Sequence, residues 1–401
     1  MGAGAIVIGI IFWVAVALVT YTYAGYPLIL ALASRLRRPR VWPEHTPSLT
    51  LIIAAYDEAA VIEAKLRDTL ALDYPADRLQ VIVAADGSTD ATAAIAASFA
   101  PRVELVHRPE RAGKMAAINR AMEHARGEVV VFSDANNRYL PDALREMARP
   151  FSDPAVGAVT GRKTVAAEDG LGYSEGLYWR YESKIRAWET RLGCCVGVNG
   201  EIFALRRSLF RPAPPGVVND DAWMAQQVIK AGHDVVYNER AVSVERVSPT
   251  AADEARRRAR IVAGQYQMLG RLSEWPWKRP AVLWELVSHK VLRPLVPFGM
   301  IAAAGAAVAG LFRPGAGSDA AGVLCLAPPW NWIAAGSQAG FYALAAVGDR
   351  LGGAVGKLAY VPRFLVDSNV AALRGLARHL RGGQSANWER VSRREAAGAG
   401  K

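Results

Sequence analysis

Apolar residues dominate the first part of this chain, where they predict a membrane anchor. No charged residue occurs from Ala3 to Ala33, and the first charge is Arg35. About 20 apolar residues are enough to span a bilayer, so residues 1–34 are predicted to be an N-terminal transmembrane segment. A cleaved signal peptide is the alternative, but it would begin with a charge and have a shorter apolar core. The uncharged start and the long apolar run favour an uncleaved anchor.

Residues 48–250 show a different pattern, in which short β-branched segments alternate with Ala-rich helical ones. Strands that alternate with helices predict an α/β domain with a doubly wound, mainly parallel sheet. The predicted strands are Leu49–Ala54, Gln80–Ala84, Val103–Val106 and Val129–Ser133. The predicted helices are Val61–Leu70, Ala91–Phe99 and Met115–Ala125.

The chain becomes apolar again in its last third. Residues 251–294 are predicted to be an amphipathic, interfacial segment, because Trp275–Lys278 combines aromatic and basic side chains as membrane-surface segments do. Residues 295–376 are predicted to be a C-terminal membrane region, and residues 377–401 a cytosolic tail.

Two spans are expected within that membrane region, Leu295–Leu311 and Ala321–Val347. The later apolar stretch Phe364–Leu376 contains three polar or charged residues, so it is expected to lie at the interface. A fourth crossing is the alternative for this stretch.

The distribution of charge suggests an orientation. Four arginines follow the first apolar segment, and by the positive-inside rule the domain after them is cytosolic; they are Arg35, Arg37, Arg38 and Arg40. The chain is therefore predicted to be a multi-pass protein of the cell (inner) membrane. Its net charge of +11 suits membrane lipid and phosphorylated substrates, and with membrane segments present no nucleic-acid partner is expected.

The three cysteines, Cys194, Cys195 and Cys325, have no metal-ligand spacing. Vicinal cysteines rarely bridge each other, so a disulfide scaffold is excluded and a cytosolic globular part fits.

Polar clusters follow three of the predicted strands, and in an open α/β sheet ligands bind beyond the carboxyl ends of strands. In Ala54-Ala55-Tyr56-Asp57-Glu58, a backbone edge, a ring and a carboxylate could hold a flat base, or Asp57 could simply cap the next helix. In Asp86-Gly87-Ser88-Thr89-Asp90, Asp86 could accept a hydrogen bond from a base, with helix capping as the alternative. No G-x-G-x-x-G is present, which argues against a dinucleotide cofactor.

The third cluster, Ser133-Asp134-Ala135-Asn136, predicts a metal site. Positions two apart in extended chain point the same way, so Asp134 and Asn136 could present two oxygens to one Mg²⁺ or Mn²⁺. Such a cation would neutralise a diphosphate leaving group. A plain polar turn is the alternative.

The fourth cluster, Asn219-Asp220-Asp221, opens the helical segment Ala222–Lys230. The helix dipole favours acids at this position, so capping alone is possible. Neighbouring carboxylates also shift each other's pKa, as a general base requires.

Two basic features complete the set. Arg111-Ala112-Gly113-Lys114 precedes a helix N-terminus, which is a natural phosphate seat. In the run from Arg256 to Arg260, Arg257 and Arg260 share one helix face. They could form a diphosphate clamp or a lipid-facing basic stripe.

Together these residues resemble the processive family 2 glycosyltransferases, the group of cellulose, hyaluronan and poly-N-acetylglucosamine synthases, over nearly the whole chain. The resemblance implies a GT-A-type fold flanked by transmembrane helices. Tyr56-Asp57-Glu58 is similar to the family's Tyr-Asn-Glu base-binding turn, with Asp in place of Asn. Asp86-Gly87-Ser88-Thr89-Asp90 is similar to its second aspartate motif, which binds uridine. Ala54, Tyr56, Glu58 and Asp86 are thus expected donor-binding residues.

The other clusters match the family in the same way. Gly113-Lys114 with Asn119 is similar to a Gly-Lys…Asn motif, which implies that Lys114 meets the diphosphate. Asp134-Ala135-Asn136 is similar to the D-x-D metal motif. Asn219-Asp220-Asp221 is similar to Thr-Glu-Asp, whose last acid is the base, which implies that role for Asp221.

One departure from the synthases concerns the acceptor. Their Q-x-x-R-W motif falls on Arg257–Ile261, where only Arg260 matches. In the synthases the Trp stacks at the acceptor site, so its absence bears against processive polymerisation. A membrane-bound bacterial subset of the family carries a similar Arg-x-x-Arg followed by Ala-Gly, as Ala263-Gly264 is here.

The resemblance implies a metal-dependent, inverting transfer from a UDP-sugar of the glucose or N-acetylglucosamine type. The acceptor would be a hydroxyl of a polysaccharide or of a lipid-linked acceptor. A transferase that adds one sugar to a polyprenyl-phosphate or other lipid is the nearest alternative. A non-catalytic membrane scaffold with this fold is another, opposed by the intact acids Asp86, Asp134 and Asp221.

Overall fold

The computed structural model describes residues 3–166, 170–246, 251–312, 320–348 and 353–381. It forms two compact units. Of the described residues, one unit contains residues 30–255 and 267–286, and the other contains the rest. The predicted interfacial segment 251–294 is thus divided between the units. Residues 382–401, most of the predicted tail, lie outside the described residues, and the predicted domain boundaries remain predictions.

The first unit is built on an eight-stranded sheet with the order β3-β2-β1-β4-β7-β6-β8-β5. All four predicted strands are present. The strands are β1 Leu49–Ala55, β2 Leu79–Asp86, β3 Glu104–Arg108, β4 Val129–Asp134, β5 Arg138–Tyr139, β6 Val156–Ala166, β7 Phe203–Arg206 and β8 Asp234–Arg246.

The sheet is mixed, but four of its seven strand pairings are parallel, in agreement with the expectation of a mainly parallel sheet. Strands β3, β2, β1 and β4 are parallel, but β7 runs antiparallel to both β4 and β6. A four-residue strand such as β7 carries no periodic signal of its direction in the sequence. Its direction depends on the path of the chain between β6 and β7, which includes the long helix α7 Gly170–Leu192.

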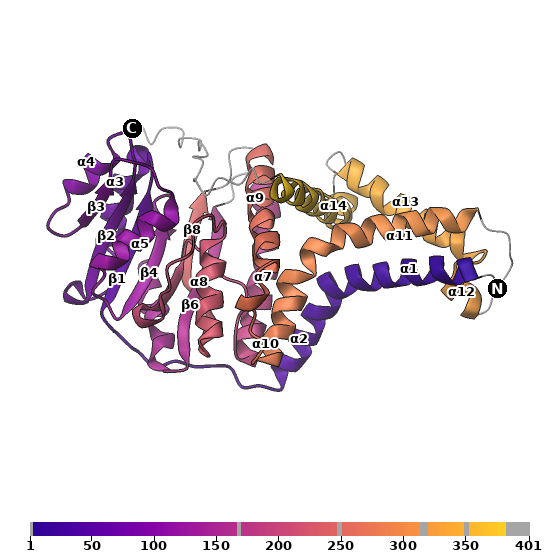
Figure 1. The fold of residues 1–401 in the computed structure, drawn as a ribbon, viewed down its shortest axis with the longest axis horizontal. Helices are drawn as coiled ribbons and strands as arrows, with labels where there is room; N and C mark the ends of the chain where they lie inside the picture. The colour runs from indigo at the N-terminus through magenta and orange to yellow at the C-terminus, as the bar shows by residue number, and fades with distance from the viewer. Residues whose placement is uncertain (1–2, 167–169, 247–250, 313–319, 349–352, 382–401) are drawn as a thin grey trace. The chain divides into compact units, whose positions relative to one another are not determined.

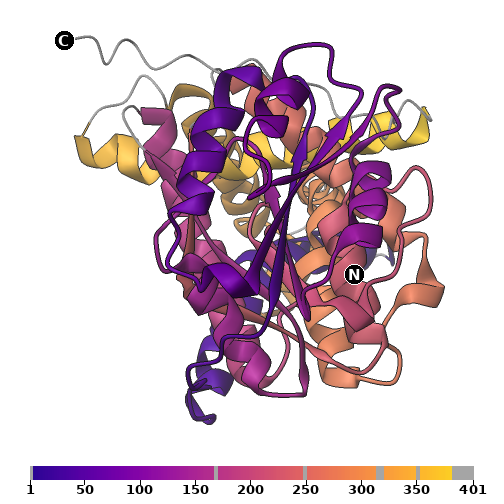
Figure 2. The same cartoon turned by 90° about the vertical axis from the view of Figure 1, so that its left-hand side faces the viewer.

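Helices cover both faces of this sheet (Figures 1 and 2). Alternate strand residues point to opposite faces, so Leu51 and Ile53 of β1 pack into one core while Ile52 packs into the other. The first core includes residues of α3 Ala59–Leu70, α4 Thr92–Ala97 and α6 Ala143–Ala148. The second includes residues of α5 Lys114–His124, α8 Asp220–Lys230 and α10 Pro280–Leu286. The result is a three-layer α/β/α arrangement in which the predicted helices are confirmed.

The second unit is helical. Its main elements are α1 Ala3–Thr20, the start of α2 Tyr26–Arg35, the middle of α9 Ala251–Leu269, α11 Val296–Leu311, α12 Ala320–Cys325, α13 Trp330–Val347 and α14 Gly353–Leu380. Within the described residues, two continuous helical stretches of 32 residues are long and apolar enough to cross a membrane, Gly4–Arg35 and Pro280–Leu311. Core helices of soluble proteins and leader peptides also meet this criterion, so the stretches indicate membrane association only weakly.

The predicted span Ala321–Val347 is not one helix. Helix α12 ends at Cys325 and α13 begins at Trp330, with Pro328 and Pro329 between them. Proline lacks the N–H that a continuing helix needs, so the apolar run is broken there. The stretch Phe364–Leu376, expected at the interface, lies inside the 28-residue helix α14.

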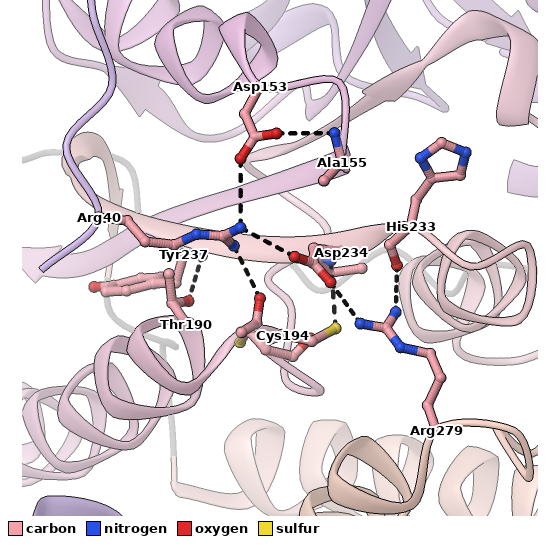
Figure 3. Close-up of polar contacts among 12 residues, drawn as sticks. Arg40, Asp153, Ala155, Thr190, Cys194, His233, Asp234, Tyr237 and Arg279 are labelled. Carbon is pink, nitrogen blue, oxygen red and sulfur yellow. Dashed lines mark hydrogen bonds and ion pairs between the residues drawn. The ribbon is translucent and has the colours of Figure 1, made fainter. Parts of the chain in front are cut away.

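The carboxylate of Asp234 contacts two arginines, Arg40 and Arg279, which come from opposite ends of the sheet unit's sequence (Figure 3). Arg40 lies in the segment between α2 and β1, and its guanidinium is 3.1 Å from Asp234 and 3.4 Å from Asp153. Arg279, just before α10, donates to Asp234 at 2.5 Å and to the carbonyl oxygen of His233 at 2.7 Å. Asp234 therefore holds two segments that are far apart in the sequence against the start of β8.

Replacing Asp234 by Asn should destabilise the sheet unit. The change removes a charge that two partly buried guanidinium groups share, and we expect a loss of about 2 kcal/mol, or roughly 4–8 °C in the unfolding midpoint. Asp73→Asn is the matched control, because Asp73 pairs with Arg145 but its side chain is 61% exposed, and exposed pairs contribute less than about 1 kcal/mol. Equal midpoints for the two variants in a thermal melt would contradict the prediction.

Candidate active site

The carboxyl ends of the parallel strands bring the predicted clusters to one edge of the sheet. In the strand register, Ala54 of β1 pairs with Ala84 of β2 on one side and with Asp134 of β4 on the other. Asp86 is the last residue of β2. The first three clusters therefore begin side by side, as expected from their positions after strands.

The first two clusters interlock through hydrogen bonds. One carboxylate oxygen of Asp57 accepts from the backbone N–H of Thr89 at 2.7 Å. The backbone N–H of Glu58 donates to the hydroxyl of Thr92 at 2.8 Å, and that of Ala59 donates to Asp90 at 3.0 Å. The alternative in which Asp57 caps the following helix is wrong, because Glu58 occupies the N-cap position of α3 and the N–H groups of Glu58 and Ala59 bond to Thr92 and Asp90.

The ring of Tyr56 lies under the guanidinium of Arg111, a residue of the predicted phosphate-binding segment 111–114. The centre of the Arg111 guanidinium is 3.7 Å from the centroid of the Tyr56 ring, a distance typical of a cation–π contact. Nη2 of Arg111 is buried without a hydrogen-bond partner. Because buried polar atoms nearly always have a partner, this nitrogen is a candidate contact for a ligand beside Tyr56.

Asp86 is only 4% exposed and holds the loop before α5. Its Oδ2 accepts from the backbone N–H of Gly113 at 2.6 Å and from that of Ala112 at 3.1 Å. Its Oδ1 accepts from Arg120 at 3.3 Å. The backbone N–H groups of Ala112 and Gly113 are thus taken by Asp86. The sequence pattern did not indicate Arg120 as a site residue, because it lies inside α5 and not at the end of a strand.

Gly87 permits this close approach of two loops. Its φ is +67°, and a Cβ placed on it would be 2.7 Å from the backbone nitrogen of Arg111. A side chain there would meet backbone rather than a flexible group, so glycine is required by both conformation and space.

Lys114 joins the third and fourth clusters. Its Nζ is 2.8 Å from Oδ1 of Asp134 and 3.4 Å from Oδ2 of Asp220. Burial lowers the pKa of Lys114, but the Asp134 and Asp220 carboxylates outweigh burial, so its pKa lies above the ordinary value. Lys114 is therefore a fixed positive charge between two of the predicted functional acids.

The residues around Asp134 also suit a divalent cation. Oδ1 of Asn136 is buried and has no hydrogen-bond partner, and the same is true of Oδ1 of Asn119. Within the described residues, no group of three His, Cys, Asp or Glu side chains could hold a metal. The protein ligands would thus be Asp134 and Asn136, which fits Mg²⁺-type sites that take one or two protein ligands and complete their shell with substrate phosphates and water.

A buried lysine supports the loop that carries Asp134. Nζ of Lys65, from α3, donates to the hydroxyl of Ser133 at 2.8 Å and to the backbone oxygen of Asn137 at 2.8 Å. Burial lowers the pKa of Lys65 to about 7, opposed by the nearby charge of Asp134. The sequence offered no signal for this residue, because it lies within an ordinary helical pattern.

Asp221 lies in the first turn of α8, after the N-cap residue Asn219. Its Oδ1 accepts from the backbone N–H of Ala222 at 2.8 Å. Its carboxylate also lies against Gly200, in the turn before β7. Asp220 and Asp221 are thus held by the same helix start.

Arg257 and Arg260 belong to the part of α9 that lies in the helical unit. Their predicted contact with the diphosphate, and the membrane-facing alternative, remain predictions.

Comparison with known proteins identifies the region that carries these residues. Residues 50–211 match the model described as "Glycosyl transferase family 2". These residues form a family 2 glycosyltransferase domain. The match includes Asp86, Lys114 and Asp134 and ends before Asp221.

Curated relatives agree with this domain assignment. An N-acetylglucosaminyltransferase of Rhizobium sp. (strain N33) is 31% identical over 161 residues, which cover 38% of this chain and 36% of the relative. A beta-monoglucosyldiacylglycerol synthase of Synechocystis is 35% identical over 127 residues, 30% of this chain and 26% of the relative. The chain therefore spans about a third or less of these two relatives. A probable glycosyltransferase of Bacillus subtilis, YdaM, is 26% identical over 66% of this chain and 67% of its own length.

A solved structure matches the fold beyond the glycosyltransferase domain. The mannosyltransferase PcManGT from Pyrobaculum calidifontis, in complex with GDP-Man and Mn²⁺, superimposes with a TM-score of 0.68 and 24% identity. The match covers 93% of this chain and 100% of that one. The fold of the sheet unit is thus of the GT-A type that the sequence resemblance implied, with a mixed sheet.

Proposed function

We propose that this protein is an inverting glycosyltransferase that moves a sugar from a nucleotide diphosphate to an acceptor hydroxyl. The observation that carries the proposal is the contact of Lys114 with both Asp134 and Asp220, since it joins the predicted diphosphate and metal residues to the neighbour of the predicted base Asp221. Asp134 ends β4, Lys114 begins α5 and Asp220 begins α8. The packing of these three elements brings the side chains together.

The donor would lie along the carboxyl edge of β1, β2 and β4. Tyr56 with Arg111 offers a planar surface for the base, and the backbone at Ala54 offers an edge that can hydrogen-bond it. Asp86 holds the 112–113 backbone and so orients Lys114, and the backbone of Glu58 bonds to Thr92. Lys114 and Asn119 would then face the diphosphate.

Asp134 and Asn136 would hold a Mg²⁺ or Mn²⁺ ion. When bound, such an ion supplies positive charge that stabilises the nucleoside diphosphate as it leaves. The mannosyltransferase of similar fold is described in complex with Mn²⁺.

Asp221 would act as general base. A carboxylate takes the proton from the acceptor hydroxyl as the oxygen attacks the anomeric carbon from the face opposite the diphosphate. Asp220, paired with Lys114, would link this base to the leaving-group side of the site. A single displacement of this kind inverts the anomeric configuration.

We propose a UDP-sugar of the glucose or N-acetylglucosamine type as donor and a polysaccharide or lipid-linked glycan as acceptor. The alternative is the addition of a single sugar to a lipid, which the likeness to a beta-monoglucosyldiacylglycerol synthase favours. A ladder of product lengths would indicate processive transfer, and one added sugar would indicate the alternative.

We also propose a multi-pass inner-membrane location with a cytosolic catalytic domain. The two long apolar helical stretches support it. Reporters fused after Arg40 and after Lys401 should read cytosolic, and one inserted at 315–319 should read external. A cytosolic signal from the 315–319 insertion would overturn this arrangement.

The function itself is tested by a screen of UDP- and GDP-sugars on the purified full chain, with release of the nucleoside diphosphate as the readout. We expect release with a UDP-sugar, dependent on an acceptor, and weaker donor binding in Asp86→Ala. No release with any nucleotide sugar, in the presence of lipid and glycan acceptors, would favour the non-catalytic scaffold.

A further inference from the structure

Gly200 lies where the carboxylate of Asp221 needs room. A Cβ placed on Gly200 would be 3.0 Å from Cβ of Asp221, 3.1 Å from its Oδ2 and 3.2 Å from its Cγ. These three atoms are the nearest neighbours of that position. Most Cβ contacts in proteins are longer, so one of the two partners would have to shift by a few tenths of an ångström.

The turn that contains Gly200 is fixed to the neighbouring strand. Asn199 is 5% exposed; its backbone N–H donates to the hydroxyl of Thr160 at 2.9 Å, and its side-chain nitrogen donates to the backbone oxygen of Gly161 at 2.8 Å. The N–H of Ile202 donates to the oxygen of Asn199 at 3.1 Å, and the N–H of Gly161 donates to the oxygen of Ile202 at 3.0 Å. With both ends of the turn held by β6, the Asp221 carboxylate is the partner that would move.

The two oxygens of Asp221 have different surroundings. Oδ1 accepts a hydrogen bond from its own helix, from the N–H of Ala222. Oδ2 is the oxygen that lies against Gly200. A side chain at position 200 would therefore crowd Cβ, Cγ and Oδ2 of Asp221.

We propose that Gly200 is a positioning residue, whose missing side chain leaves the space in which Oδ2 of Asp221 meets the acceptor hydroxyl. The inference rests on the proposed function, because it assumes that Asp221 is the base. The backbone of Gly200 does not adopt the left-handed region, so space rather than conformation explains the glycine.

This makes Gly200→Ala a specific test. We expect kcat to fall about 10-fold or more, since a 1 Å misplacement at a reaction centre costs roughly 10²-fold. The Kd of the donor nucleotide and the unfolding midpoint should not change.

Gly270→Ala is the matched control. Gly270 also lies in the sheet unit and outside the left-handed region, and its only neighbour within 4 Å is the backbone oxygen of Gln267 at 3.6 Å. This variant should behave like the unmodified protein. Equal loss of activity and stability in both variants would mean that alanine acts through general destabilisation and would overturn the proposal.

A double-mutant cycle separates this inference from the proposed function. If Gly200 acts through Asp221, Gly200→Ala should add nothing to the residual rate of Asp221→Asn. Normal kcat in Gly200→Ala beside an impaired Asp221→Asn would overturn the role of Gly200 and leave the base assignment intact. Normal transfer by Asp221→Asn itself would overturn the base assignment, and the role of Gly200 with it.

Discussion

Asp221→Asn is expected to lower single-turnover transfer by about 10²–10⁴-fold, the usual contribution of a general base. Asparagine keeps the size of the side chain and the oxygen that accepts from Ala222, but it cannot take a proton. Donor affinity should change little, since the proposed donor contacts come from other residues. The measurement is a rapid-quench assay with saturating donor, together with a separate nucleotide-binding titration.

Asp220→Asn is the informative comparison, because Asp220 is adjacent but has a different partner. Its Oδ2 lies 3.4 Å from Nζ of Lys114, so its loss should alter donor binding more than the chemical step. Near-normal transfer by Asp221→Asn would refute the assignment of the base. If Asp220→Asn is inactive while Asp221→Asn is near normal, Asp220 would be the general base instead.

Removal of divalent metal should abolish transfer, and Mg²⁺ or Mn²⁺ should restore it. The paired oxygens of Asp134 and Asn136 are the basis for this expectation, since the Asn136 oxygen is buried without a partner. Asp134→Ala should impair both metal binding and turnover. It also removes the closest carboxylate of Lys114, at 2.8 Å, so the loss should exceed that of Asn136→Ala.

Binding of Mn²⁺ in the presence of nucleoside diphosphate provides a readout that does not depend on activity. Asn136→Ala should weaken this binding while the Lys114 contact with Asp134 stays intact. Asp73→Asn, an exposed acid paired with Arg145, should leave binding unchanged. Full activity in excess chelator would contradict the metal requirement.

Local patterns were sufficient for the first half of the sheet unit. The strands β1, β2, β3 and β4 and the helices between them were predicted within a few residues, because their apolar periodicity is strong. Strands β1 and β4 in particular are buried on both faces. The same patterns did not indicate β7, whose direction makes the sheet mixed. Nor did they show that the apolar run Ala321–Val347 is interrupted before Trp330.

The sequence by itself determined which chemical groups stand at the carboxyl edge of the sheet. Tyr56 follows β1, and Asp86 and Asp134 end β2 and β4. Each group was therefore expected at the carboxyl end of a strand, but the placement of β2 and β4 on either side of β1 was decided by the fold. The resemblance to family 2 enzymes added roles for these residues, and the family 2 domain is confirmed over residues 50–211.

Only the tertiary structure decided which group meets which. In the folded chain Lys114 pairs with Asp134 and Asp220. Asp86 accepts a hydrogen bond from the backbone just before α5, and Gly200 lies next to Asp221. Each of these contacts joins segments that are remote in the sequence. Their geometry depends on how helices and strands pack, and the local preferences of a residue carry no information about a partner brought in by another element.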